Sequence, residues 1–342
     1  MRDAASRPQQ HPPALTENAP FPSVSVNLQN LIALAKTRPE FQLEVAADLS
    51  VKRLSPAEIV AGIDEQAEKI STGYAEGAMV WRSWGSGPPL LFLHGGSGSW
   101  THWIRNVQAL AGRYRVIAPD MPGFGDSGPA AEPPSSETAA DAVALGLPKV
   151  TGGEPVMIVG FSFGSMVGTW LAKKVPANVA ALVLVGAVGM GLRRNTIEFQ
   201  SWRRLKDDER REAHRAKLRA LMIDDPSRID DLAIHLQSEN TRRTRINTRR
   251  FVRSTPLKDN LPDSNVALAG IWGEHDATAA PYLDERREFI HSLRPDAPFE
   301  VIKGIGHWVQ YEGADAFNAT LTRVLDSIRP SVGMKSVDRA HR

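Results

Sequence analysis

Short runs of apolar, often β-branched residues recur along the chain between residues 78 and 302. Within each run the apolar character is continuous rather than alternating, which is typical of strands that are buried on both faces. We predict strands at 78–84, 89–93, 114–119, 156–159, 180–185, 266–272 and 299–302, with helices between them at 103–110, 139–145 and 317–328. Strands that alternate with helices predict an α/β fold, with a mostly parallel sheet and helices on both faces.

The pattern before residue 76 is different. Residues 1–25 contain five prolines and few large apolar groups, which predicts a disordered arm. Residues 26–75 have helical spacing, and Ser55, Pro56 and Glu58 form the start signal of one helix. We interpret this helical extension as a packing or dimerisation element that could form a homo-oligomer; substrate gating is the alternative. Residues 76–330 would form the main domain, and 331–342 a flexible tail.

The alternation also breaks at about 190–255. Residues 193–253 hold fifteen arginines and two lysines against ten acidic residues, in polar helical sequence. A helical insertion between two strands predicts a lid over the site. Most of these arginines would lie on a solvated face, whereas one or two that point inward could bind an anionic substrate.

Composition excludes several classes of function. Of 342 residues 42% are hydrophobic, which is ample for a core, and the net charge of +2 gives no indication of nucleic-acid binding. The chain has no cysteine, hence no thiolate nucleophile and no Cys-ligated metal. The first residues lack the apolar region of a signal peptide, and the longest apolar run, 179–192, is too short to span a bilayer. We therefore expect a cytoplasmic protein without a membrane span.

The stretch Gly160-Phe161-Ser162-Phe163-Gly164 carries the strongest chemical signal. It lies between a predicted buried strand and a stretch of helical spacing at 165–174. In that context G-x-S-x-G forms a nucleophile elbow, a tight turn that presents the serine hydroxyl above the sheet. The sequence therefore predicts Ser162 as a nucleophile; an ordinary glycine-rich turn is the alternative.

A serine nucleophile needs a base, and the base needs an acid to orient it. Of nine histidines, His307 follows the last predicted strand in a glycine-rich loop, where open α/β sheets place their sites. Asp276 follows the preceding strand and is the predicted acid, with Glu274 as a neighbouring exposed carboxylate. The chain order Ser162, Asp276, His307 is the order of this fold class.

Acyl chemistry also needs hydrogen-bond donors for the oxyanion. The loop at 93–100 follows a strand and contains two adjacent glycines, so the amide of Gly96 is one predicted donor and that of Phe163 is the other. A phosphate-binding role is disfavoured because the loop lacks the Gly-Lys-Ser/Thr ending of a P-loop. No metal and no cofactor are expected.

These motifs together resemble the α/β-hydrolase superfamily over roughly residues 78–329. The matching motifs are HGG at 94–96, DMPGFGDS at 120–127, GFSFG at 160–164, WGEHD at 272–276 and GHW at 306–308. Residues 93–107 and 307–318 look closest to the meta-cleavage-product hydrolases, which cleave ring-fission products at a carbon–carbon bond. That subfamily has asparagine where this chain has Phe161, and a lid arginine at the approximate place of His235. The loss of both implies a less acidic, more apolar substrate.

We therefore expect a metal-independent serine hydrolase that forms an acyl-enzyme from a small to medium carboxylic ester or activated carbonyl substrate. Phe161, Phe163, Trp308 and Trp100 are predicted to line an apolar pocket, with His235 as a further substrate-binding candidate. One alternative is carbon–carbon bond hydrolysis of a ring-fission dienoate, and another is a catalytically silent ligand-binding homologue. A haloalkane dehalogenase is disfavoured because it would need a carboxylate at position 162.

Overall fold

A computed structural model of the chain describes residues 54–198, 204–251 and 254–328. Three predicted segments lie wholly or partly outside the described residues. They are the arm at 1–25, the first part of the extension, 26–53, and the tail at 331–342. Their predicted roles stay predictions.

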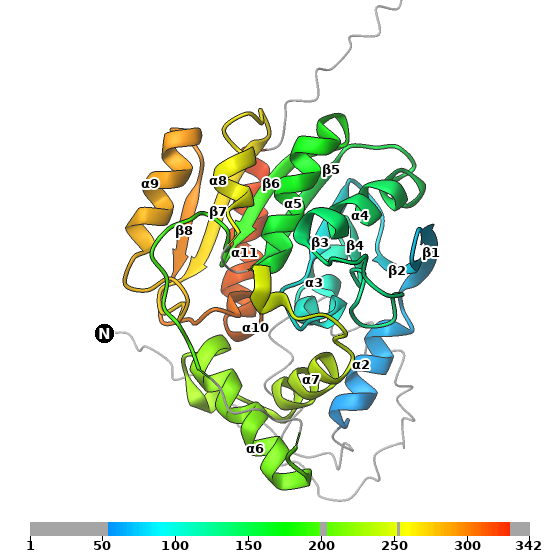
Figure 1. Ribbon diagram of the computed structural model, residues 1–342, viewed down its shortest axis with the longest axis vertical. Helices are drawn as coiled ribbons and strands as arrows, with labels where there is room; N and C mark the ends of the chain where they lie inside the picture. Colours follow the sequence, from blue (N-terminus) through cyan, green and yellow to red (C-terminus); the bar gives the residue numbers. More distant parts are fainter. Residues whose placement is uncertain (1–53, 199–203, 252–253, 329–342) are drawn as a thin grey trace, which may run out of the picture. The chain divides into compact units, whose positions relative to one another are not determined.

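The fold is built on an eight-stranded sheet with the order β1-β2-β4-β3-β5-β6-β7-β8 (Figure 1). From β4 to β8 all neighbouring strands are parallel, whereas β2 runs antiparallel to both β1 and β4. The strands are β1 (Glu68–Tyr74), β2 (Gly77–Trp84), β3 (Pro89–Leu93), β4 (Arg115–Pro119), β5 (Val156–Phe161), β6 (Val179–Val185), β7 (Ala267–Gly273) and β8 (Phe299–Ile302). The mostly parallel sheet that the apolar runs predict is therefore confirmed.

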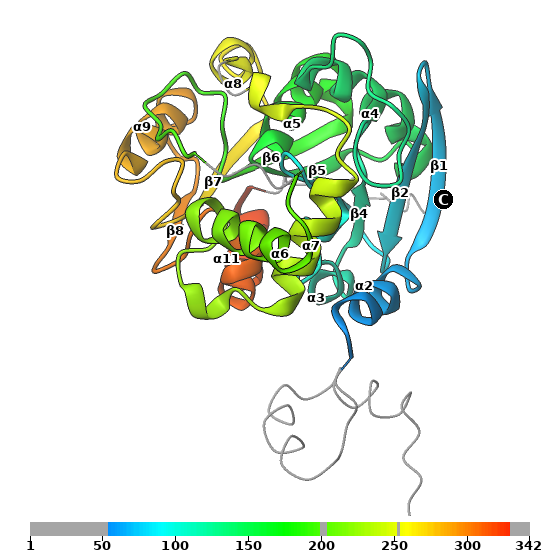
Figure 2. The ribbon, with the colours of Figure 1, turned by 60° about the horizontal axis from the view of Figure 1, so that its bottom comes forward.

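Helices cover both faces of the sheet, as continuous apolar strands require (Figure 2). Along β3, Leu90 and Phe92 belong to one buried cluster, while Leu91 and Leu93 belong to the other. The first cluster includes residues of α3 (Val107–Ala111), α10 (Val309–Glu312) and α11 (Ala314–Ile328). The second includes residues of α4 (Ser136–Thr151), α5 (Phe163–Lys174) and α9 (Leu283–Leu293).

The boundary predicted at residue 75 is wrong. Helix α2 (Pro56–Asp64) does begin with the expected capping box of Ser55 and Glu58, but residues 68–74 form strand β1. β1 pairs with β2 through a hairpin in which Tyr74 faces Gly77. Because a strand's backbone hydrogen bonds come from its neighbour, the local pattern of this mostly exposed edge strand did not reveal it. Residues 68–74 therefore belong to the sheet.

A helical insertion separates β6 from β7, as the sequence predicts. It contains α6 (Asp207–Lys217), a π-helical turn (Leu218–Met222), α7 (Asp231–Arg242), a 3-10 turn (Thr248–Phe251) and α8 (Pro256–Asn260). In Figure 1, α6 and α7 lie across the carboxyl ends of the parallel strands, whereas α8 lies beside α5. No helix among the described residues is both long enough and apolar enough to cross a membrane.

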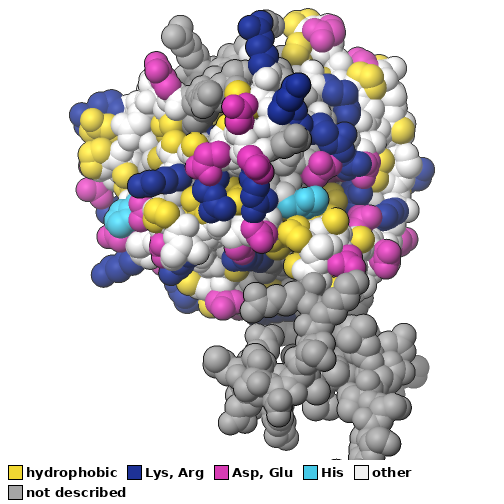
Figure 3. Space-filling view, turned by 90° about the horizontal axis from the view of Figure 1, so that it is seen from below, with side chains coloured by type: hydrophobic (Ala, Val, Ile, Leu, Met, Phe, Trp, Pro, Cys, Tyr) yellow, Lys and Arg dark blue, Asp and Glu magenta, His cyan; other side chains and the backbone are white. Residues whose placement is uncertain are grey.

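Basic and acidic side chains are interspersed on the face that includes the insertion (Figure 3). Arg211 pairs with Asp231 across α6 and α7, Arg242 pairs with Glu239 along α7, and Arg243 reaches an acid outside the insertion. These arginines therefore lie on a solvated, ion-paired surface, as expected for most of the basic residues in this segment.

Candidate active site

Ser162 lies at the junction of β5 and α5 with a left-handed backbone, φ 50° and ψ −109°. A residue other than glycine rarely adopts a positive φ, and its presence here marks a strained turn. The turn is held by the amide of Ser162, which donates to the carbonyl of Val185 at 2.9 Å. Strand β5 and helix α5 approach so closely that a Cβ on Gly160 would lie 2.7 Å from the carbonyl oxygen of Gly164. The expected elbow geometry is therefore present at Ser162.

His307 and Asp276 meet at the carboxyl ends of β8 and β7. The Nδ1 atom of His307 lies 2.8 Å from Oδ2 of Asp276, and both side chains are buried. The other oxygen, Oδ1, accepts from the amide of Thr278 at 2.8 Å and from its hydroxyl at 2.7 Å. The acid is thus fixed on both of its oxygens.

The electrostatics of this pair favour a charged carboxylate. Burial acts to raise the pKa of Asp276. The adjacent His307 and the hydrogen bonds from His307 and Thr278 act in the opposite direction and are stronger together, so the pKa is lowered. Asp276 therefore stays ionised at neutral pH and can hold the imidazole in one orientation.

Ser162 and His307 both line one cavity of about 760 Å³. One wall comes from residues that lie just after the ends of β3, β5 and β6, namely Gly96, Phe163 and Val188. The other comes from the segment after β6 and from the insertion, with Asn195, Lys217, Leu221, Met222 and Thr248 among the lining residues. The nucleophile candidate and the base candidate therefore line the same cavity.

The two predicted oxyanion donors also border this cavity. Within the described part of the chain, neither the amide of Gly96 nor that of Phe163 has a hydrogen-bond acceptor. The loop that carries Gly96 is fixed to the core, because the amide of Gly95 donates to Nδ1 of the buried His102 at 3.1 Å. Both amides remain available for a ligand oxygen.

The predicted substrate-binding residues are divided by the structure. Phe161 and Phe163 line the cavity. Trp308 is instead buried against Tyr311, with its indole N–H donating to the carbonyl of His102 at 3.0 Å. Trp100 packs against Trp84 with its ring centroid 5.3 Å away, so neither tryptophan lines the cavity.

His235 lies on α7, where it lines a separate hollow with Pro56 and His214. It is therefore placed away from Ser162, and its expected role in substrate binding has no geometric support. Over the described ranges, no three His, Asp or Glu side chains are grouped as metal ligands.

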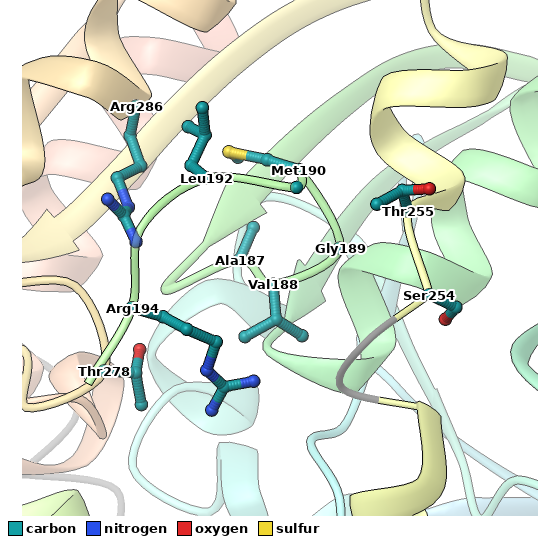
Figure 4. Close-up of a pocket in the computed structure, with 11 residues that line it drawn as sticks. Ala187, Val188, Gly189, Met190, Leu192, Arg194, Ser254, Thr255, Thr278 and Arg286 are labelled. Atoms are coloured by element: carbon teal, nitrogen blue, oxygen red, sulfur yellow. The ribbon is translucent and has the colours of Figure 1, made fainter. Parts of the chain in front are cut away.

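Thr278 and Arg194 are site residues that the sequence prediction missed. Thr278 is two residues after the predicted acid, and this spacing was its only local signal. Arg194 lies on the segment that follows β6, next to Arg193, and it lines both the main cavity and a smaller one. The smaller cavity, of about 230 Å³, is drawn in Figure 4.

The chain has recognisable relatives. A family model described as alpha/beta hydrolase fold matches residues 88–221. The 2-hydroxy-6-oxo-6-phenylhexa-2,4-dienoate hydrolase of Burkholderia cepacia is 27% identical over 250 residues, which cover 68% of this chain and 86% of that protein. The 2-hydroxy-6-oxononadienedioate/2-hydroxy-6-oxononatrienedioate hydrolase of Comamonas testosteroni is 28% identical over 249 residues, covering 68% and 86%.

A solved structure from Burkholderia cenocepacia, described as an aryl esterase, superposes with a TM-score of 0.64 and 25% identity. The match covers 76% of this chain and 99% of that one. Together with the sheet order and the strand–turn–helix at Ser162, these likenesses identify the fold. The chain therefore belongs to the α/β-hydrolase superfamily, with similarity to its carbon–carbon hydrolases as well as to an esterase structure.

Proposed function

We propose that the chain is a serine hydrolase with Ser162, His307 and Asp276 as its triad, acting on a small to medium carboxylic ester or activated carbonyl substrate. The observation that carries the proposal is the shared cavity: Ser162 on its strained turn and His307 paired with Asp276 both line it. The elbow of Ser162 alone would be compatible with a silent binding protein, but the buried, doubly fixed acid beside His307 favours catalysis.

The proposed mechanism follows from the contact between His307 and Asp276. Asp276 engages Nδ1 of His307, which leaves Nε2 as the atom that takes the proton from Ser162. The serine Oγ attacks the substrate carbonyl, and the amides of Gly96 and Phe163 stabilise the oxyanion. His307 then gives its proton to the leaving group, and water attacks the acyl-enzyme with His307 again as base.

Carbon–carbon hydrolysis of a dienoate by the same residues is the second candidate. The observation that favours it is the similarity to two relatives that are named as hydrolases of dienoates. The Phe161 ring beside the His307 ring, with centroids 5.0 Å apart, gives the cavity an apolar wall and favours the ester candidate. Parallel kinetics with a p-nitrophenyl ester and a ring-fission dienoate distinguish the two, and strong preference for the dienoate would overturn the ester choice.

The test of the nucleophile is covalent labelling with a fluorophosphonate. We expect the wild type to be labelled once and Ser162→Ala to be unlabelled, with Ser292→Ala on the exposed side of α9 as the matched control. Ser162→Ala and His307→Ala should each lower turnover by roughly three to six orders of magnitude, because a triad acts as a unit. Near-normal turnover in either variant, with folding intact by circular dichroism, would refute the role of that residue.

A further inference from the structure

The main cavity continues into the smaller one. The two share the lining residues Val188, Arg194 and Thr278, so Arg194 stands where they adjoin. Figure 4 shows Arg194 beside Thr278 and Val188, while Arg286 extends from α9 toward the same loop near Leu192. A ligand that is bound at Ser162 and reaches into the smaller cavity must therefore pass the guanidinium of Arg194.

The charge of the smaller cavity has one sign. Its charged lining residues are Arg194 and Arg286, and the remaining polar side chains are the hydroxyls of Ser254, Thr255 and Thr278. Arg286 is buried and held: its guanidinium donates to the carbonyls of Tyr282 and Arg193 and lies 3.7 Å from Glu285. Arg286 thus contributes a fixed positive charge, while its guanidinium is already engaged by these carbonyls.

Arg194 differs from Arg193 in its contacts, although it feels the charge of Asp276. Arg193 pairs with Glu285 and lies over the ring of Tyr282, whereas Arg194 makes no ion pair or hydrogen bond with any described residue. Glu198 lines the main cavity on the same segment, yet no ion pair joins it to Arg194 among the residues described. A guanidinium that borders two cavities and makes no hydrogen bond with a described residue is well suited to bind a carboxylate.

We propose that Arg194 binds a carboxylate of the substrate, so that the preferred substrates carry a negative charge on the acyl chain a few bonds from the carbonyl that Ser162 attacks. This inference rests on the proposed function and names the substrate class of that same site. It revises the expectation of a more apolar substrate, because the anion-binding residue comes from the segment after β6 and not from the place of His235.

The experiment compares mono-p-nitrophenyl adipate with its neutral methyl ester, which has the same chain but no charge. We expect wild-type kcat/KM to be at least about tenfold higher for the anion, as one charge-assisted contact allows. Arg194→Gln should lower kcat/KM for the anion by about ten- to thirtyfold, mainly through KM, and change the neutral ester by less than about threefold. Arg194→Lys should recover part of the preference, since it retains the charge but not the planar fork.

Arg193→Gln is the matched control, because it removes the adjacent charge that points to Glu285 and Tyr282. It should leave the preference for the anion unchanged. The proposal is overturned if the wild type shows no preference for the anion, or if Arg194→Gln affects both esters equally.

Calorimetric titration with adipate separates this inference from the proposed function. If neither ester is cleaved and Ser162 is not labelled, the hydrolase proposal fails, but adipate binding that is lost in Arg194→Gln still supports the anion site. No adipate binding to the wild type, in a protein that does cleave the neutral ester, refutes the anion site alone.

Discussion

Asp276 accepts hydrogen bonds on both carboxylate oxygens, one from His307 and two from Thr278. This arrangement leaves the acid no freedom to rotate away from the imidazole. Thr278 borders the cavity, but its amide and hydroxyl are both engaged by Asp276, so we assign it a positioning role that acts through Asp276. The geometry of the proposed triad thus depends on a side chain that has no proposed role in the chemistry.

Thr278→Val tests this role, because valine has a similar shape but no hydroxyl. One of the contacts that lower the pKa of Asp276 would be lost, so that pKa should rise and the carboxylate should be neutralised at a higher pH as acid is added. We expect kcat to fall about three- to tenfold at pH 7.5 and further toward pH 5, with little change in KM. The measurement is a pH–rate profile; Thr278→Ser should restore the wild-type curve, and a valine variant with that same curve would contradict the assignment.

At the scale of elements, the insertion is joined to the loop that carries His307. The carbonyl of Met222, at the end of the π-helical turn, accepts from the amide of Trp308 at 2.7 Å. The buried carboxylate of Glu312 on α10 accepts from the amides of Asp224, Asp225 and Gly306 at 3.1, 2.8 and 2.7 Å. One carboxylate therefore holds both the base of the insertion and the histidine loop.

Glu312→Gln should loosen this junction. The amide group keeps one acceptor oxygen but presents N–H donors to backbone amides, which leaves buried donors unsatisfied. We expect the free energy of unfolding to fall by about 2–4 kcal/mol. Amide hydrogen exchange should become faster at 222–225 and 303–308, as measured by mass spectrometry.

Glu300→Gln on β8 serves as the control. It removes a surface ion pair with Arg323 of α11 and should alter neither quantity by much. Unchanged exchange at 222–225 in the Glu312 variant would show that Glu312 does not hold the insertion.

At the scale of the whole molecule, acid stability should depend on His214, which is buried on α6. Burial, with the charges of Lys217 and Arg210, lowers the pKa of His214 to about 4. Charged or titratable groups that line the hollow beside His214 are Arg210, Arg211, Asp231 and His235. Because the unfolded histidine titrates near pH 6.5, the unfolded state binds the proton first as the pH falls.

Stability should therefore decrease as the pH falls from about 6.5 to 4, by up to about 1.4 kcal/mol per pH unit from this residue. His214→Gln should remove this contribution and make the dependence shallower across that window without abolishing it, because burial also lowers the pKa of His94 and of His102. Urea unfolding at pH 7.0, 5.5 and 4.5 measures this pH dependence of stability. Carboxylates with lowered pKa values, such as Asp64 and Asp276, titrate below this pH window. A variant with the same slope as the wild type would contradict this assignment.

The parts of the fold that followed from sequence are those whose signal is local. The buried runs at 89–93 and 156–159 became β3 and β5, and the capping box at Ser55 became the start of α2. Strand β1 was missed because its mostly exposed residues carry no apolar strand pattern. Its strand conformation comes from the hydrogen bonds with β2. Trp308 and Trp100 were expected in the cavity because of their positions in the chain, yet packing directs both into the core.

The sequence by itself determined the mostly parallel part of the sheet, the tight turn at Ser162 and the chain order of the proposed nucleophile, acid and base. Each depends on neighbours within a few residues, because hydrophobic spacing and glycine at fixed positions act locally. Only the tertiary structure decided that Thr278 fixes Asp276, that the insertion closes one wall of the cavity, and that Arg194 borders it while His235 does not. Those outcomes depend on how segments far apart in the chain pack together, and side-chain direction at such junctions is set by contacts that no local pattern contains.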